Sequence, residues 1–175
     1  MIDATDDQPL PQDERAPTDK IKVFVSYSRR DAEFVGSIVE ALSARDDIHV
    51  FRDTDDILPT EEWKKRLENL IGQADTVVFC LSPYSAESDV CRWEVEYAES
   101  LNKRIMPVVV ERVEHDEVPE GLTKLNFIFF DSAEGFRMSL DSLVQSLHTD
   151  IGWIREHTRI GELARRWTQS GKSRD

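Results

Sequence analysis

The chain has 175 residues, 39 % of them hydrophobic, which suffices for one α/β domain but not for two of ordinary size. Its formal net charge of −13 argues against nucleic acid as a partner, since phosphate binding needs a basic face. The two cysteines lack the spacing of a metal site or a disulfide framework, and no apolar run reaches the ~18 residues of a membrane span, so we expect a cytoplasmic protein with no metal and no membrane partner.

Residues 1–20 are predicted to form a disordered acidic leader. This segment holds six acidic residues and three prolines, and apart from Ile2 and Leu10 it has almost nothing to bury. The predicted fold therefore begins at Ile21.

The first predicted elements are a strand, a turn and a helix. Residues 21–25 form a short β-rich run, and Ser28 to Asp31 has the pattern of a capping box ahead of an apolar helical stripe. A second strand over 49–51 is followed by a polar loop over 52–59. Thr60 then caps a second helix, whose stripe comprises Trp63, Leu67, Leu70, Ile71 and Ala74.

The second half of the domain continues this alternation. Residues 76–81 are uniformly apolar, which is typical of a central parallel strand that is buried on both faces. A Ser-rich loop over 82–89 and a helix over about 90–101 follow. The last predicted elements are strands over 105–110 and 127–130 and a helix with apolar positions at Phe136, Leu140, Leu143, Val144 and Leu147. Five strands alternating with helices predict a flavodoxin-like, doubly wound sheet of five parallel strands with helices on both faces, over residues 21–149.

Residues 150–175 differ in composition from the rest of the chain. Ile160, Leu163, Ala164 and Trp167 form an apolar helical stripe, and several arginines make the segment basic. Two interpretations are open. The segment is either a C-terminal helix docked on the domain or a connector to a further module that is missing from this chain.

Glu94 is the most informative residue for function. On a helix with 100° per residue it falls on the same side as Cys91, Val95 and Ala98, which form an apolar stripe. A carboxylate on an inward face is costly unless something binds it, and the predicted helix start places it in the first turn, where the helix dipole favours an anion. The pattern alone leaves a structural ion pair and a functional carboxylate both open.

Other candidates lie where strands end, because ligands of open α/β sheets bind beyond the carboxyl ends of the strands. Loop 52–59 is either a solvated turn or a mobile binding loop. Trp63 is either a core residue or a ligand platform, and Trp93 points away from the apolar stripe, as expected of outer packing or an interface. Cys91 has no histidine near it in sequence and is interpreted as a small core residue. The sequence contains no GxGxxG, P-loop or nucleophile-elbow motif.

Four segments in this order resemble the TIR domain family. Residues 22–31, an apolar run followed by Ser-Tyr, resemble its first box, and the loop that ends at Leu58-Pro59 resembles its BB loop. Residues 82–85 and 90–94 resemble its Ser-Pro segment and its Trp-Cys-x-x-Glu motif. Residues 105–110 and 127–130 match its late strands. The resemblance covers residues 21–149 and is greatest to bacterial NAD⁺-cleaving TIR modules, in which a Trp-rich tail often leads into a sensor or repeat region.

The resemblance implies roles for particular residues. Enzymatic TIR domains hydrolyse or cyclise NAD⁺, and their glutamate, which contacts the ribose, corresponds to Glu94. In such a site NAD⁺ is the substrate, and no cofactor or metal is needed. The residues that the resemblance places around the cleft are Ser26, Tyr27, Arg29, Asp53, Leu58, Trp63 and Val90. The family often has Trp where this chain has Val90, four residues before the glutamate.

Two functions from different classes follow from the resemblance. The first is an NAD⁺ glycohydrolase or cyclase, activated by association with other TIR domains in a homo-oligomer or filament and acting in bacterial immune or toxin-like signalling. The second is a non-catalytic scaffold that recruits other TIR domains. The carboxylate at position 94 favours the enzyme, and Val90 favours the scaffold.

Overall fold

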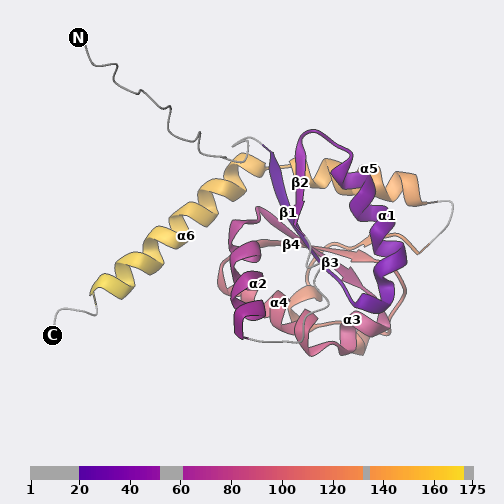
Figure 1. Ribbon diagram of the computed structural model, residues 1–175, viewed down its shortest axis with the longest axis horizontal. Coiled ribbons are helices and arrows are strands. Elements are labelled where there is room, and N and C mark those ends of the chain that lie inside the picture. The colour runs from indigo at the N-terminus through magenta and orange to yellow at the C-terminus, as the bar shows by residue number, and fades with distance from the viewer. Residues whose placement is uncertain (1–19, 52–60, 132–134, 172–175) are drawn as a thin grey trace, which may run out of the picture.

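A parallel sheet of five strands forms the centre of the molecule. The computed structural model describes residues 20–51, 61–131 and 135–171. Within these ranges the strands lie in the order β2-β1-β3-β4-β5, which is the flavodoxin-like order, so the predicted fold class is confirmed (Figure 1). The strands are β1 (Ile21–Ser26), β2 (Ile48–Phe51), β3 (Thr76–Leu81), β4 (Arg104–Val109) and β5 (Ile128–Phe129).

Helices cover both faces of this sheet. Helices α1 (Ala32–Ser43) and α5 (Phe136–His148) pack on one face, and α2 (Glu61–Gln73) and α4 (Asp89–Ser100) pack on the other. Successive strand residues alternate between the two cores, so Val23 and Val25 face α1 and α5 while Phe24 faces α2. Two 3₁₀ turns, η2 (His115–Glu117) and η3 (Glu120–Leu122), lie between β4 and β5.

The central strand β3 fixes the geometry of the sheet. All six of its residues are buried, as the uniform apolar run predicted. It pairs with β1 so that Phe79 lies beside Ser26, and with β4 over six residues, including Pro107. The carboxyl ends of β1 and β3 therefore lie at the same edge of the sheet, where Ser26 ends β1 and Ser82 follows β3.

Two local predictions at this edge were wrong. The segment predicted as a Ser-rich loop contains a short helix, α3 (Pro83–Glu87). Ser82 caps this helix, Ser85 completes the capping box, and Pro83 occupies a position that favours helix initiation. Ser28 does not begin α1 directly. Its side chain accepts a hydrogen bond from the Arg30 amide at 3.4 Å and caps a 3₁₀ turn, η1 (Arg29–Asp31), because the Asp31 side chain is engaged elsewhere.

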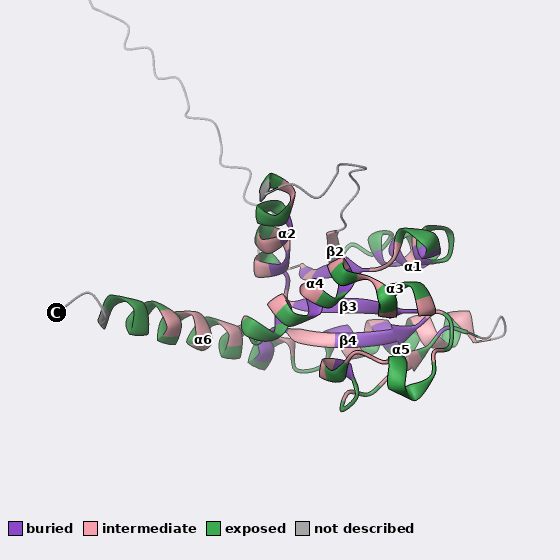
Figure 2. Cartoon of the chain, turned by 90° about the horizontal axis from the view of Figure 1, so that it is seen from below, coloured by how far each residue is buried: buried purple, intermediate pink, exposed green. Residues whose placement is uncertain are grey.

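Helix α6 (Ile151–Gly171) extends away from the sheet (Figures 1 and 2). It contacts the domain near its first turns, where Ile154 is buried. Of the two interpretations left open for this segment, docking would cover its apolar stripe, whereas Ile160, Leu163 and Trp167 are exposed. No helix in the described ranges has the length and apolar character required to cross a bilayer.

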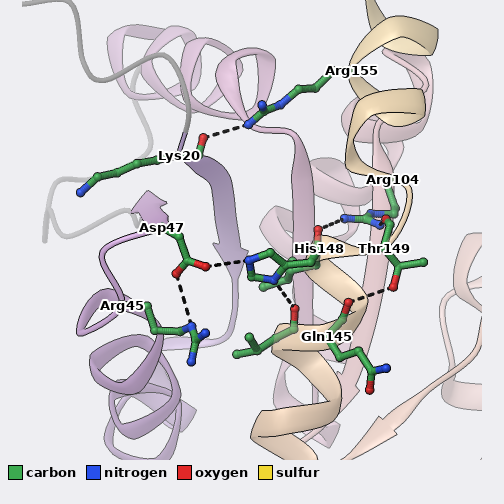
Figure 3. Close-up of polar contacts among 10 residues, drawn as sticks. Lys20, Arg45, Asp47, Arg104, Gln145, His148, Thr149 and Arg155 are labelled. Carbon is green, nitrogen blue, oxygen red and sulfur yellow. Dashed lines mark hydrogen bonds and ion pairs between the residues drawn. The ribbon is translucent and has the colours of Figure 1, made fainter.

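Two arginines make polar contacts at the amino edge of the sheet, near the junction of α5 and α6. Arg104 at the start of β4 donates to the backbone carbonyls of Ser146, Leu147 and Thr149 at 2.8–3.0 Å. Arg155 of α6 contacts both carboxylate oxygens of the Asp75 side chain at 3.1 Å. Figure 3 shows Arg155 reaching the Lys20 carbonyl and His148 reaching Asp47 in the same region. This edge is therefore stabilised by ion pairs and by the hydrogen bonds that Arg104 donates to carbonyls at the end of α5.

Candidate active site

Ser26 and Glu94 meet at the carboxyl edge of the sheet. Ser26 is the last residue of β1, and its side chain faces the same side as Phe24, toward α2 and α4. Glu94 projects inward from α4, and the Ser26 hydroxyl donates a hydrogen bond to its carboxylate. The two residues are 1 % and 5 % exposed. The inward position of Glu94 that helical spacing predicted is confirmed, since the buried residues of α4 are Cys91, Glu94, Val95 and Ala98.

The helix dipole contributes less to this carboxylate than the sequence suggested. Helix α4 begins at Asp89, so Glu94 lies in its second turn, and the acid in the first turn is Asp89. The influence of the dipole falls off within the first turn. The dipole is therefore not the main compensation for the burial of Glu94, whose carboxylate accepts a hydrogen bond from Ser26.

A second buried acid, Asp31, lies in the same part of the sheet edge. The Ser82 hydroxyl donates to the Asp31 carboxylate at 2.5 Å, and both residues are buried. Sequence analysis interpreted Asp31 only as part of a capping box. The missed signal is its spacing, because Asp31 precedes the inward residues Val35, Ile38 and Leu42 by one to three helical turns.

The two cysteines lie close to these acids. Burial, with a smaller contribution from the charge of Glu94, raises the pKa of the Cys91 thiol to about 11. Burial also raises the pKa of Cys80, with a second contribution from Asp31. A thiol that stays protonated at neutral pH is a poor nucleophile. Both cysteines are buried, which confirms the interpretation of Cys91 as a core residue.

The other predicted site residues differ in their positions. Tyr27, directly after β1, and Val90, in the first turn of α4, are half-buried. Arg29 is exposed on η1. Asp53 and Leu58 lie outside the described residues. Within the described ranges there is no group of three or more His, Cys, Asp or Glu that could hold a metal ion.

Trp63, Trp93 and their neighbours form an aromatic layer between α2 and α4. Trp63 is half-buried against the core that contains Phe24 and Leu67, as expected of a core residue. Trp93 stacks on Tyr97 with ring centres 5.4 Å apart, and the Lys64 ammonium lies 5.2 Å from the Trp93 ring centre. Trp93 therefore packs on the outside of the α2–α4 core, one of the two positions that the sequence had left open for it.

The segments that build this site lie within a stretch of the sequence that matches a known family. A profile described as "TIR domain" matches residues 23–144, which is most of the chain. The chain belongs to the TIR domain family. Within this family's Trp-Cys-x-x-Glu motif, Cys91 and Glu94 are both inward-facing, and Val90 takes the position of the tryptophan.

Known proteins similar to this TIR domain include Toll-like receptor 6 of mouse and human. They are 23 % and 24 % identical to it over 121 and 122 residues. Each alignment covers 66 % of this chain and only 15 % of the receptor, so the chain spans a small part of the length of these relatives.

Solved structures show the same fold. The TIR domain of the Toll-related receptor TRR-2 from Hydra magnipapillata is 18 % identical, with a TM-score of 0.61 over 73 % of this chain and 98 % of that one. The TIR domains of the activated Roq1 resistosome are also 18 % identical, with a TM-score of 0.57 over 73 % and 99 % of the two chains. At this identity the likeness shows the architecture and not the activity.

Proposed function

We propose that this TIR domain cleaves NAD⁺ at the bond between nicotinamide and ribose, with Glu94 as the essential carboxylate. The observation that carries the proposal is the burial of Glu94 on the inward face of α4, at the edge where α/β sheets bind ligands. A buried carboxylate destabilises a fold unless it is compensated, so its presence beside Ser26 favours a functional role.

One carboxylate suffices for this chemistry. Nicotinamide leaves as a neutral molecule when the C1′–N bond breaks, so its departure needs no general acid. The ribose passes through an oxocarbenium-like transition state, as in glycoside cleavage. A fixed anion near C1′ and the ribose hydroxyls stabilises the developing positive charge, most strongly where water is excluded. Attack by water then gives ADP-ribose and a proton, and attack by the adenine gives a cyclic isomer.

In this proposal the serines at the sheet edge orient the acids. The Ser26 hydroxyl fixes one oxygen of Glu94, and Ser82 does the same for Asp31 while its main chain begins α3. Tyr27 and Arg29, one and three residues after Ser26, would border the substrate. Val90 in the first turn of α4 and Trp63 in α2 would border it as well. NAD⁺ is the substrate, and the proposed reaction requires no other cofactor.

The decisive experiment measures NAD⁺ loss and nicotinamide release by chromatography after incubation with concentrated protein. We expect Glu94→Gln to reduce cleavage at least ~100-fold, because the negative charge is removed while the side-chain volume is kept. The matched control is Glu96→Gln, an exposed acid on the same helix, which should retain wild-type activity. Equal turnover of Glu94→Gln and wild type would exclude the assignment.

We also propose that association with other TIR domains activates the enzyme. The Roq1 TIR domains were solved within an activated resistosome, an assembled state. Activity that scales with the fraction of assembled protein would rise as the protein is concentrated. Net charge of −13 opposes association at low salt, so moderate salt should favour it. We expect the cleavage rate per mole to rise with light scattering and to be lost in Leu58→Asp. A flat rate across the transition from monomer to oligomer would contradict this mechanism.

A non-catalytic scaffold is the second candidate. The curated relatives matched over this domain are receptors, and Val90 replaces the aromatic residue that the family often has before its glutamate. A scaffold of this kind would associate with other TIR domains without consuming NAD⁺. The chromatographic assay, run at a concentration where scattering shows oligomers, separates the two functions.

A further inference from the structure

Helix α6 presents large apolar side chains to solvent along one side. Trp153, Ile160, Leu163 and Trp167 are 68 %, 55 %, 50 % and 81 % exposed. With 100° per residue, Trp153, Ile160 and Trp167 recur every seven residues and stay within 40° of each other around the helix. Soluble domains rarely leave a contiguous stripe of this kind uncovered. We call these four residues the α6 stripe.

Ile160, Leu163 and Trp167 of the α6 stripe point away from the domain, whereas Trp153 lines a cavity at the edge of the domain. Ile154, Arg155 and Arg165 lie on the other side of the helix from Ile160 and contact the domain, and Arg165 donates to the Ser100 carbonyl at 3.4 Å. Ile154 is buried, and Arg155 binds the Asp75 carboxylate. These contacts orient Ile160, Leu163 and Trp167 outward, and α6 extends away from the sheet (Figure 2).

A cavity of about 570 Å³ lies beside Trp153, the first residue of the stripe, at the amino ends of β4 and β5. Trp153 and His157 line it and stack on each other with ring centres 4.9 Å apart. Trp167 of the same helix lies 14 residues further along, which is ~21 Å at 1.5 Å per residue, so it cannot reach this cavity. The cavity therefore offers room beside Trp153 for an aromatic side chain from outside the chain.

We propose that α6 pairs in an antiparallel manner with α6 of a second copy of this chain. The stripe is self-complementary, because Trp153 and Trp167 lie seven residues to either side of Ile160. A two-fold axis through the contact of the two Ile160 side chains places Trp167 of each copy opposite Trp153 of the other, at the rim of the cavity. Such an isologous contact closes on itself and gives a dimer.

The area and the charges of α6 fit this occupant. Two tryptophans that bury on the order of 150–250 Å² each, together with Ile160 and Leu163, make a contact near the lower end of specific interfaces when both copies are counted. Arg159, on the flank of the stripe, is paired with Glu156 of its own helix at 2.6 Å. When two α6 helices associate, each copy therefore contributes an Arg159–Glu156 ion pair with no net charge. Helix α6 carries four arginines and two glutamates, so it does not add to the repulsion of an acidic chain.

Sedimentation of the full chain over a wide concentration range tests the pairing. It reads association alone, so it does not depend on NAD⁺ cleavage and can succeed where that proposal fails. We expect wild type to dimerise and Ile160→Asp to weaken the dimer at least ~100-fold, since a two-fold contact is changed twice. The matched control is Met138→Asp, which removes a 75 % exposed side chain on α5 and should leave the dimer intact. If wild type stays monomeric, or dimerises equally well with Ile160→Asp, the pairing is excluded.

Cross-linking gives the orientation of the two helices. A mixture of Trp153→Cys and Trp167→Cys proteins should form a mixed disulfide, because the antiparallel pair brings these positions together. Wild type is the background control, since Cys80 and Cys91 are buried. Disulfides between two molecules of the Trp153→Cys variant, without the mixed product, would indicate parallel helices and overturn the proposal. So would a protein that remains monomeric and instead binds anionic vesicles through Trp167, because the stripe would then serve a lipid surface.

Discussion

The two edges of the sheet hold their charged side chains in different ways. At the amino edge, the Asp75 carboxylate is bound by Arg155, and the guanidinium of Arg104 donates to three backbone carbonyls. At the carboxyl edge, the hydroxyls of Ser26 and Ser82 donate to the carboxylates of Glu94 and Asp31. At the first edge one arginine binds a carboxylate and another caps a helix end, whereas at the second each buried acid accepts a hydrogen bond from a serine hydroxyl.

This difference separates stability from function. An arginine that satisfies the last carbonyls of a helix stabilises the fold directly, since those groups have no partner within the helix. A carboxylate that serves a reaction is placed for that reaction, and a site that is poised for catalysis usually reduces stability. We therefore expect the loss of Arg104 at the amino edge to lower the free energy of unfolding, and the loss of the Glu94 charge at the carboxyl edge to change activity more than stability.

The largest effect on stability is expected for Arg104→Met. This change removes the donors to Ser146, Leu147 and Thr149 and to the Thr76 hydroxyl while keeping an apolar chain of similar length. We expect a loss of about 3 kcal/mol of unfolding free energy and a fall in the melting temperature of roughly 6–12 °C. Glu94→Gln should change the unfolding free energy by less than about 1 kcal/mol. Denaturant titrations of both variants measure this contrast, and equal destabilisation would show that the two edges do not differ in this way.

The fold followed from the sequence because its signals are periodic. The apolar run at 76–81 and the stripes of α1, α2 and α5 depend only on burial and helical spacing, and the structure has them at the expected places. The short helix α3 was missed because Ser82-Pro83 both ends a strand and begins a helix, and spacing cannot distinguish the two over so few residues. The apolar stripe of α6 was recognised, but its direction depends on Arg155 and Asp75, which are 80 residues apart.

The candidate site was predicted in part. Glu94 stood out because one polar residue on an apolar helical face is a local pattern. Its hydrogen bond with Ser26 joins residues 68 positions apart and could be expected only from the general rule about strand ends. The bond between Ser82 and Asp31 spans 51 positions, and Asp31 was taken for a capping residue because its immediate neighbours suit that role equally well. Prediction of contacts between residues at the edge of the sheet requires the order of the strands, which cannot be read from the sequence.

An intermediate effect is expected for Asp31→Ala. Removal of this carboxylate leaves the buried Ser82 hydroxyl without the acceptor that it has at 2.5 Å, which should cost about 1–3 kcal/mol of unfolding free energy. Asp31→Asn retains an oxygen acceptor in the same place and should recover most of the loss. Because the acid positions the segment that begins α3, NAD⁺ cleavage should fall in the alanine variant and recover in the asparagine variant. If both variants are as stable and as active as wild type, Asp31 does not position Ser82 and does not belong to the site.

The smallest effect is expected at the amino edge, for Asp47 and pH. The His148 side chain contacts the Asp47 carboxylate at 2.7 Å, and this hydrogen bond lowers the pKa of Asp47 below its usual value of 3.8. A folded-state pKa that is lower than the unfolded one means that the unfolded chain binds more protons as the pH falls. The contribution to stability is therefore complete above about pH 4 and is lost as the pH falls through the lowered pKa.

Both partners of this pair are about half exposed, so solvent screening keeps its contribution below about 1 kcal/mol. The measurement is the difference in unfolding free energy between wild type and Asp47→Asn at neutral pH and again below pH 4, where the difference should shrink toward zero. Asp46→Asn, an exposed neighbouring acid, is the control for a simple change in net charge. Added salt should reduce the neutral-pH difference for Asp47→Asn, because the pair lies within reach of counterions. If the difference in unfolding free energy persists unchanged in acid, the charge of Asp47 does not stabilise the fold. Its contribution then comes from the backbone, where the Asp47 carbonyl accepts a hydrogen bond from the Ile21 amide.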